Sequence, residues 1–353
     1  MTVTSAGRAP DAASLAASPP LPFLAVELAY GLREVGALER ELTALAEGCG
    51  APPTARLGWQ LAACTDSRQV EPWVLLLRDT SGTAVGAAVL VDHVEDRRIQ
   101  STTLAGTDGG HRGALLTREP HVAHALGESW HLLRADQHRP APVMLGPLPA
   151  DDLVVAAFAA GLSGSWLEPA AEIPVIRSGV GSPREYLSAG MSRTLRKTAN
   201  RLAADGRTAG ARFTSDAGEI RGQLPQLEQV YRQRDHVHGR ASDLDDAARQ
   251  QTWRHRVGDL ADAGVLELAT LEIDGELAAY TLGINDDPTY RLLEGRFVTG
   301  WARYSPGRYL EALVVERALA ARGATTFDWM TAVAPDSLLG RNDADPMVLV
   351  RLA

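Results

Sequence analysis

A short segment in the second half of the chain places an acidic and a basic residue on one face. Tyr290–Phe297 is predicted to be a β-strand, and alternate side chains of a strand share a face, so Glu294 and Arg296 point the same way. A glutamate there could act as a general base, directly or through a water molecule. An arginine beside it could orient a carboxylate of a donor or substrate. The alternative is an ion pair that only faces solvent.

Three further side chains are candidates for acid–base chemistry. Asp328 lies between two aromatic residues in a predicted buried strand, and a buried carboxylate needs partners, so its role is either catalytic or structural. Tyr304 could donate a proton to a leaving group, or it could simply pack. His236 and His238 lie in a polar stretch predicted to be a loop near the cleft. An imidazole has a suitable pKa for a general base, with His238 the candidate carried forward, although a loop histidine is more often only solvated.

Positive charge is concentrated in one predicted helix, Ser182–Asp205. At 100° per residue its basic side chains share one arc, while Leu195, Ala199 and Leu202 lie on the other side. These basic residues are Arg193, Arg196, Lys197 and Arg201. They could bind phosphate groups, and the alternative is a solvated helix face. The aromatic residues expected of a surface that binds single-stranded nucleic acid are missing.

The loop before a second helix is a candidate phosphate site. Tyr309–Arg322 is predicted to be that helix, with Gly323 at its end. A helix N-terminus presents free N–H groups and the positive end of the helix dipole, which suit phosphate. The residues that would hold a donor there are Ser305, Gly307 and Arg308. The alternative is a plain helix start with Pro306 in its first turn.

These residues depend on a simple order of elements in the second half. Val265–Leu271 and Leu277–Ile284 are apolar runs on either side of an Asp-Gly pair, which is a strong hairpin signal. Tyr290–Phe297 is the third strand, and Thr326–Met330 is a short strand after the helix. The predicted order is therefore three antiparallel strands, a ligand-binding loop, a helix and a strand.

The first half repeats this order. Its hairpin, third strand, glycine-rich loop, helix and strand are Trp73–Leu77 with Ala84–Val91, Ile99–Ala105, Gly106–Gly113, His121–Arg134 and Pro142–Leu145. A repeat of this size indicates a duplicated domain. Further predicted elements are a strand at Pro22–Leu28, helices at Leu32–Glu47, Asp151–Ala160, Leu224–Gln233 and Ala247–Leu260, a strand at Glu172–Arg177, and a last strand at Met347–Val350 that would close the sheet.

Length and composition set the outer limits. A chain of 353 residues favours two domains, and we place a disordered leader at 1–20 and domains at 21–180 and 181–353, with the boundary in Gly179–Pro183. Two unpaired cysteines, Cys49 and Cys64, indicate a reducing compartment, and no apolar run reaches the ~18 residues of a membrane span. We therefore expect a cytoplasmic protein that has no membrane segment. The oligomeric state stays open.

Other chemistries find little support. His121, His124 and His131 share a helix but lack the ligand pattern of a zinc site, so no metal is expected. Phosphate-loop and serine-esterase motifs are missing. The net charge of −9 argues against a surface that binds polyanions throughout.

Taken together, these motifs resemble the catalytic half of a GNAT-type acyltransferase. The residues that carry the resemblance are Asp274-Gly275, Glu294-Gly295-Arg296, Tyr304-Ser305-Pro306-Gly307 and Gly323 through Phe327-Asp328-Trp329. Ser192–Lys197 with Asn200–Leu202 fits the subgroup with two such domains in tandem, which includes the Fem-like aminoacyl-tRNA-dependent transferases. The resemblance implies an α/β fold of two GNAT-like domains in tandem, each a mixed, mostly antiparallel sheet flanked by helices.

The resemblance also implies an activity. It is direct transfer of an acyl or aminoacyl group to an amine of a small-molecule acceptor, forming an amide or ester bond, with no tightly bound cofactor. Acetyl-CoA-using members carry a Q/R-x-x-G-x-G/A loop before the helix, and neither Arg303–Tyr309 nor Gly110–Leu115 matches it. That departure slightly favours aminoacyl-tRNA as donor. The alternatives are an acyl-CoA-dependent N-acetyltransferase and a non-catalytic GNAT-like binding module.

Overall fold

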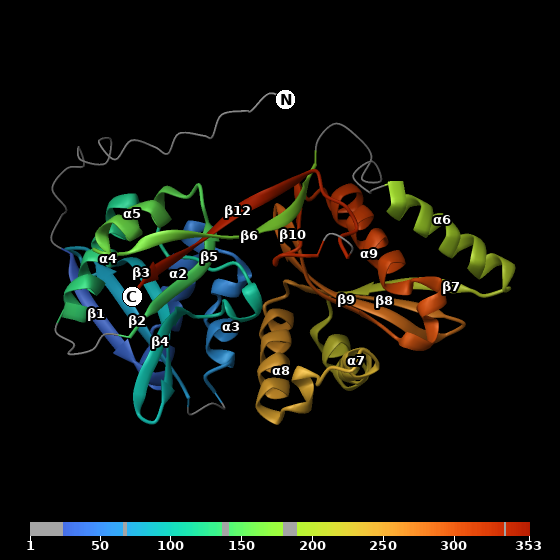
Figure 1. Ribbon diagram of the computed structural model, residues 1–353, viewed down its shortest axis with the longest axis horizontal. Helices are drawn as coiled ribbons and strands as arrows, with labels where there is room; N and C mark the ends of the chain where they lie inside the picture. Colours follow the sequence, from blue (N-terminus) through green and yellow to red (C-terminus); the bar gives the residue numbers. More distant parts are fainter. Residues whose placement is uncertain (1–23, 66–68, 136–140, 179–188, 335–336) are drawn as a thin grey trace.

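The computed structural model describes residues 24–65, 69–135, 141–178, 189–334 and 337–353, which form an α/β fold (Figure 1). The strands are β1 Ala25–Tyr30, β2 Val70–Arg78, β3 Ala84–Glu95, β4 Arg98–Leu104, β5 Val143–Pro149, β6 Trp166–Arg177, β7 Ala209–Thr214, β8 Leu266–Ile273, β9 Glu276–Asp286, β10 Thr289–Phe297, β11 Thr326–Asp328 and β12 Asp343–Leu352. The helices are α1 Gly31–Ala37, α2 Glu39–Cys49, α3 Leu57–Ala62, α4 Pro120–Ala135, α5 Leu153–Gly161, α6 Ala189–Ala204, α7 Ala217–Val237, α8 Ala247–Asp262 and α9 Pro306–Glu316.

All these strands belong to one sheet in the order β1-β2-β3-β4-β5-β12-β6-β11-β10-β9-β8-β7. Most neighbours are antiparallel, and the parallel pairs are β4 with β5 and β10 with β11. Each parallel pair is joined by a crossing helix, α4 in the first half and α9 in the second. The predicted α/β class and the mostly antiparallel sheet flanked by helices are confirmed.

In the first half, alternation along the central strands fills two cores. On β2, Leu75 and Leu77 belong to the core under α4 and α5, whereas Val74 and Leu76 belong to the core under α1, α2 and α3. All four side chains are fully buried. A strand covered on both faces is expected to be a continuous apolar run, as this one is.

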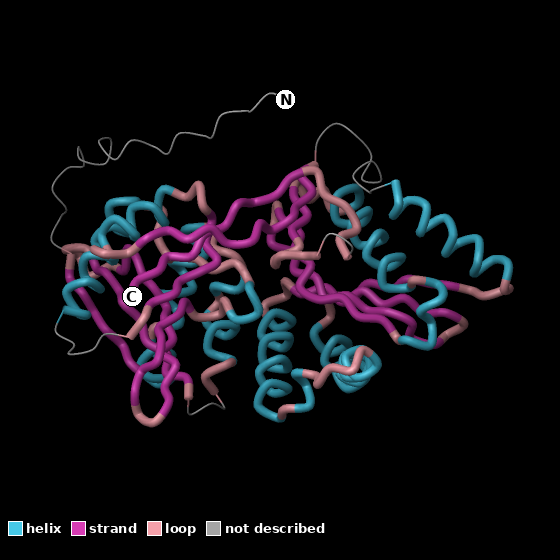
Figure 2. Tube along the Cα trace, viewed as in Figure 1, coloured by secondary structure: helices cyan, strands magenta, loops and turns pink. Residues whose placement is uncertain are grey.

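The second half is layered in the same way (Figure 2). Leu310 and Val314 of α9 pack on one face of the sheet, and α7 and α8 cover the other. The predicted Asp-Gly turn joins β8 to β9, with φ of 53° at Asp274 and 82° at Gly275. Positive φ at both positions gives the twist that suits a tight hairpin.

Two strands cross between the halves in the middle of the sheet. β6 comes from the first half, yet it pairs with β11 of the second. β12, at the end of the chain, contains the predicted last strand Met347–Val350 and lies between β5 and β6. Figure 1 shows both strands spanning the two halves. The halves are thus joined by backbone hydrogen bonds, and the division into 21–180 and 181–353 stays a prediction.

Some predicted elements need correction. Leu32–Glu47 is two helices, because Leu38 leaves the helical conformation with φ −90° and ψ 3°. α7 continues past Gln233 to Val237, so His236 lies in a helix rather than in a loop. The short helix α3 and the edge strand β7 were not predicted. The predicted leader and the boundary segment Gly179–Pro183 lie outside the described residues.

Candidate active site

Two cavities lie against β10 and share part of its backbone. One, of about 490 Å³, is here called the α9 cavity. It is lined by residues of β9, β10, the start of α9 and the segment after β11, including Tyr280, Arg296, Ser305, Gly307, Arg308, Glu311 and Trp329. The other, of about 940 Å³, is here called the interface cavity, and it lies between the halves. It is lined by Trp59, Asp108, His111, Tyr231, Trp253 and Arg256, among others. Leu293 and Glu294 line both cavities.

A β-bulge produces this shared wall. Leu292 pairs with Gly283 and Glu294 pairs with Leu282, so Leu293 is an extra residue on β10. A bulge bends the strand and re-aims its side chains. The bend explains why residues of one strand line both cavities. The alternating pattern from which Glu294 was predicted gave no sign of this bulge.

Uncharged donors hold the Glu294 side chain. The hydroxyl of Tyr280 donates to one carboxylate oxygen at 2.5 Å, and the indole nitrogen of Trp253 donates to the other at 3.2 Å. Burial and the nearby Glu294 charge raise the pKa of Tyr280 well above its usual value, so the phenol stays protonated. The hydrogen bonds that orient Glu294 thus come from uncharged donors, and Arg296 is a charged neighbour.

Arg296 lines the α9 cavity, and its guanidinium carbon lies 4.3 Å from the ring centroid of Tyr231. Burial opposes its charge, but Glu294 and Tyr231 raise the pKa of Arg296 above its usual value. The predicted Glu294–Arg296 pair is therefore part of a cavity wall rather than a solvent-facing ion pair.

The start of α9 forms another wall of the α9 cavity, and it contains the residues that were predicted to hold a donor. Ser305 takes a left-handed conformation with φ of 48° and is followed by Pro306 at the first helical position. Ser305, Gly307 and Arg308 all line the cavity. A Cβ at Gly307 would lie 3.3 Å from the Phe297 ring, so glycine lets the helix start approach β10 closely.

A second carboxyl group in the α9 cavity, that of Glu311, was not predicted. It lies on α9, part-buried, and accepts a hydrogen bond of 2.9 Å from the indole nitrogen of Trp329. Burial raises the pKa of Glu311 to about 7, against the opposing effects of Trp329 and Arg308. Sequence inspection missed it because one glutamate on an amphipathic helix carries no motif.

Residues of the first half complete the interface cavity, and these too were missed. Arg256 of α8 forms a bidentate ion pair with Asp108 at 2.6 and 2.7 Å, and its guanidinium stacks over Trp59 at 4.6 Å. His111 lies edge-on to Trp59, and burial lowers the pKa of His111 to about 4, so the ring is neutral at pH 7. The glycine-rich loop Gly106–Gly113 thus contributes a cavity wall, and no signal in the sequence connected it to β10.

Two predicted catalytic residues lie elsewhere. Tyr304 is buried, and its hydroxyl donates to Asp205 at 2.7 Å. His238 is an exposed residue that caps α7. Neither lines the α9 cavity or the interface cavity. The geometry therefore favours packing for Tyr304 and solvation for His238, which were the alternative interpretations of both residues.

The predicted basic helix is α6, which packs against α9. Its four basic side chains, Arg193, Arg196, Lys197 and Arg201, are exposed. Arg201 also donates to the backbone carbonyl of Arg303, in the turn before α9. This contact places one end of the basic face beside the α9 cavity.

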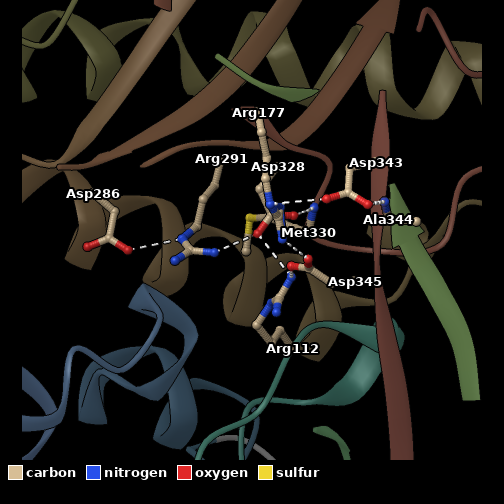
Figure 3. Close-up of polar contacts among 9 residues, drawn as sticks. All are labelled: Arg112, Arg177, Asp286, Arg291, Asp328, Met330, Asp343, Ala344 and Asp345. Carbon is tan, nitrogen blue, oxygen red and sulfur yellow. Dashed lines mark hydrogen bonds and ion pairs between the residues drawn. The ribbon is translucent and has the colours of Figure 1, made fainter. Parts of the chain in front are cut away.

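Asp328 belongs to a different structure, a row of alternating charges here called the Asp–Arg chain (Figure 3). One of its carboxylate oxygens accepts from Arg291 at 2.6 Å and from Arg112 at 3.4 Å, and the other accepts from the backbone N–H of Met330 at 2.7 Å. The chain runs Asp286, Arg291, Asp328, Arg112, Asp345, Arg177, Asp343. Asp328 also lines a third cavity, of about 310 Å³, but its bonds to two arginines and a backbone N–H favour the structural role.

The residues that the structure describes contain neither a cluster of metal-ligand side chains nor a membrane-spanning helix. Within those ranges no three His, Cys, Asp or Glu side chains cluster as a metal site would require. No helix of the described part of the chain is long and apolar enough to span a bilayer.

Comparison with known proteins adds a family to this geometry. A family model for the acetyltransferase (GNAT) domain matches residues 189–336, whereas no curated protein matches the chain. The fold is similar to that of FemX, at 10% identity and a TM-score of 0.58 over 82% of this chain and 86% of the other. It is also similar to the C-terminal domain of a predicted lysylphosphatidylglycerol synthetase from Agrobacterium fabrum, at 14% identity and a TM-score of 0.52 over 90% and 93%.

A further similar structure is L-PGS from Bacillus licheniformis, at 14% identity and a TM-score of 0.50 over 89% and 91% of the two chains. At such identities the likeness establishes the fold alone. The matched segment contains β10, with Glu294, and all of α9. The match of residues 189–336 to the acetyltransferase (GNAT) domain supports an acyltransferase.

Proposed function

We propose that this protein transfers an acyl or aminoacyl group from an activated donor to an amine of a small molecule. The donor lies in the α9 cavity, the acceptor lies in the interface cavity, and Glu294 stands between them. The observation that carries the proposal is that Leu293 and Glu294 line both cavities. Two reactants that approach one carboxylate from two sides are brought together without a covalent enzyme intermediate.

The reaction balances with Glu294 as general base. The acceptor nitrogen attacks the carbonyl carbon of the donor, so a C–N bond forms and the C–O bond of an ester or the C–S bond of a thioester breaks. Glu294 takes the proton that the amine loses, directly or through water, and the leaving oxygen or sulfur is protonated in turn. A backbone N–H of the bulged strand supports the negative charge on the carbonyl oxygen.

The donor is slightly more compatible with aminoacyl-tRNA than with acyl-CoA. Pro306 occupies the first helical position, so one backbone donor is missing where a pyrophosphate would bind. The exposed basic face of α6 reaches the turn before α9 through Arg201. The similarity of the fold to FemX and to a lysylphosphatidylglycerol synthetase domain is consistent with an aminoacyl donor. Acyl-CoA stays the alternative, because the cavity at the start of a helix can also accept its phosphates.

Mass spectrometry of reaction products tests the proposal. The purified protein is offered charged total tRNA in one reaction and a mixed acyl-CoA pool in another, each with small-molecule cell extract as acceptor. A new amide in the tRNA reaction supports aminoacyl transfer, and one in the acyl-CoA reaction supports the alternative donor. If both reactions give no product at any extract concentration, while the protein binds a component of the extract, the binding-module interpretation is favoured and the transfer proposal fails.

A further inference from the structure

The α9 cavity contains a carboxyl group that the proposed transfer step does not use. Glu311 lies on α9 in the same cavity as Glu294, and Trp329 donates to its Oε1 atom. The hydrogen bonds among the described residues include the one to Oε1 and none to the Oε2 atom of Glu311. A part-buried carboxylate oxygen that faces a cavity is available to a ligand.

The surroundings of Glu311 favour a positively charged ligand group. In the described part of the chain, the charged side chains that line this cavity with Glu311 are Arg308 on its own helix and Glu294 and Arg296 on β10. The guanidinium of Arg296 lies over the Tyr231 ring and near the Glu294 charge, and its Nε atom has no hydrogen-bond partner among the described residues. Burial raises the pKa of Glu311 to about 7, which means that the cavity without ligand disfavours its negative charge. A cation bound at Oε2 would relieve this cost, whereas an anion would increase it.

Position along α9 separates this group from the phosphate-compatible end of the cavity. Pro306 begins the helix, and Glu311 follows five residues later, which is about 7.5 Å along the helix axis. One cavity wall therefore offers N–H groups and Arg308 at its start and a carboxylate further in. Aminoacyl-tRNA has phosphates at one end and an ammonium group beside the reacting carbonyl at the other. An acyl-CoA carries no cation on a simple acyl group.

We propose that Glu311 binds the ammonium group of an aminoacyl donor and so selects aminoacyl over simple acyl donors. This inference rests on the proposed transferase function and names the donor class for the same site. The carboxylate accepts the ammonium at Oε2 while Trp329 holds Oε1, which fixes the ester carbonyl beside Glu294.

Glu311→Gln separates charge recognition from structure. The glutamine keeps an oxygen that accepts the Trp329 hydrogen bond, so α9 stays docked, but it removes the negative charge. Glu316→Gln is the matched control, because Glu316 lies on the same helix and does not line the cavity.

The test is filter binding of charged total tRNA at low salt, with the aminoacyl amines either free or capped by N-acetylation. We expect the wild-type protein and Glu316→Gln to bind the free-amine form roughly 10- to 100-fold more tightly, as a hydrogen bond to a charged group predicts. We expect Glu311→Gln to bind both forms equally, with the affinity of the wild type for the capped form.

Equal binding of the two forms by the wild type, or a preference that survives in Glu311→Gln, would overturn the inference, as would failure to bind charged tRNA in either form. This binding result tests only the role of Glu311, and the proposed transferase function is tested separately by product formation. Product formation from acyl-CoA together with equal binding of the two tRNA forms would leave the transferase standing and remove only the role of Glu311.

Discussion

Glu294 and Asp328 lie on neighbouring strands, β10 and β11, yet the two carboxylates differ in their hydrogen-bond donors and in their exposure to cavities. Tyr280 and Trp253, both uncharged, donate to Glu294, which faces two cavities. Two arginines and a backbone N–H surround Asp328, which is 2% exposed. Glu294 accepts its hydrogen bonds from uncharged donors and has Arg296 only as a charged neighbour, whereas two arginines donate directly to Asp328.

The difference corresponds to two tasks at the junction of the halves. The Asp–Arg chain joins Arg112 and Arg177 of the first half to strands β10, β11 and β12. Buried charges of this kind are tolerated only when they are paired, and removal of one partner leaves another uncompensated. The chain therefore links the first half to β10, β11 and β12, whereas Glu294 lines the interface cavity.

The largest expected effect is on catalysis at Glu294. Glu294→Gln should lower kcat/KM by about 10²- to 10⁴-fold, because a general base contributes about that much to a proton-transfer step. The glutamine oxygen can still accept from Tyr280 or Trp253, so the melting temperature should stay close to that of the wild type. Steady-state kinetics with whichever donor gives product, together with thermal melting, measure both quantities.

Glu276→Gln is the control for that comparison, since Glu276 is an exposed residue at the start of β9. It should change neither rate nor stability. Wild-type kcat/KM in the Glu294 variant would show that Glu294 is not the base and would remove the contrast with Asp328.

The next effect is on stability at Asp328. Asp328→Ala should destabilise the fold by about 3–5 kcal/mol, because Arg291 and Arg112 lose a buried partner. Urea denaturation measures this decrease in the free energy of unfolding. The residual activity of the folded fraction should stay within a few-fold of wild type, since Asp328 lines neither of the two cavities at Glu294. A stable Asp328→Ala protein without activity would instead indicate a catalytic carboxylate.

Replacement of Glu311 should have an effect of intermediate size, and it should stabilise the fold rather than destabilise it as Asp328→Ala does. Burial raises its folded-state pKa to about 7 from 4.5, so the unfolded chain loses the proton first, and this group's contribution to stability falls as pH rises from 4.5 through 7. Glu311→Gln should therefore be more stable than the wild type by about 1–3 kcal/mol at pH 8, and equal to it near pH 4. Denaturation at the two pH values measures the difference, and a gap independent of pH would contradict it.

The local parts of this comparison could be predicted from sequence, and the long-range parts could not. Apolar runs around an Asp-Gly pair predicted β8 and β9, and alternation on β10 singled out Glu294. The partners of Asp328 were hidden, because Arg112 is 216 residues away and reaches it only through the crossing of β6 and β12. Trp59 and His111 join the interface cavity in the same way, through packing between halves rather than through any local pattern.

The smallest expected effect on stability comes from the exposed basic face of α6, which provides a reference for charges that are neither buried nor paired across the halves. The double substitution Arg196→Gln with Lys197→Gln should change stability by less than about 0.5 kcal/mol, as is usual for surface positions.

If this face binds tRNA phosphates, the slope of log affinity against log salt should fall by roughly 0.7–0.9 for each phosphate group that the variant no longer binds. Filter binding of tRNA across a salt series measures the slope, with Arg33→Gln and Arg40→Gln, exposed on α1 and α2, as the matched pair. The same slope in both doubles would make the α6 face a solvated surface, and the donor phosphates would then have to bind at the start of α9.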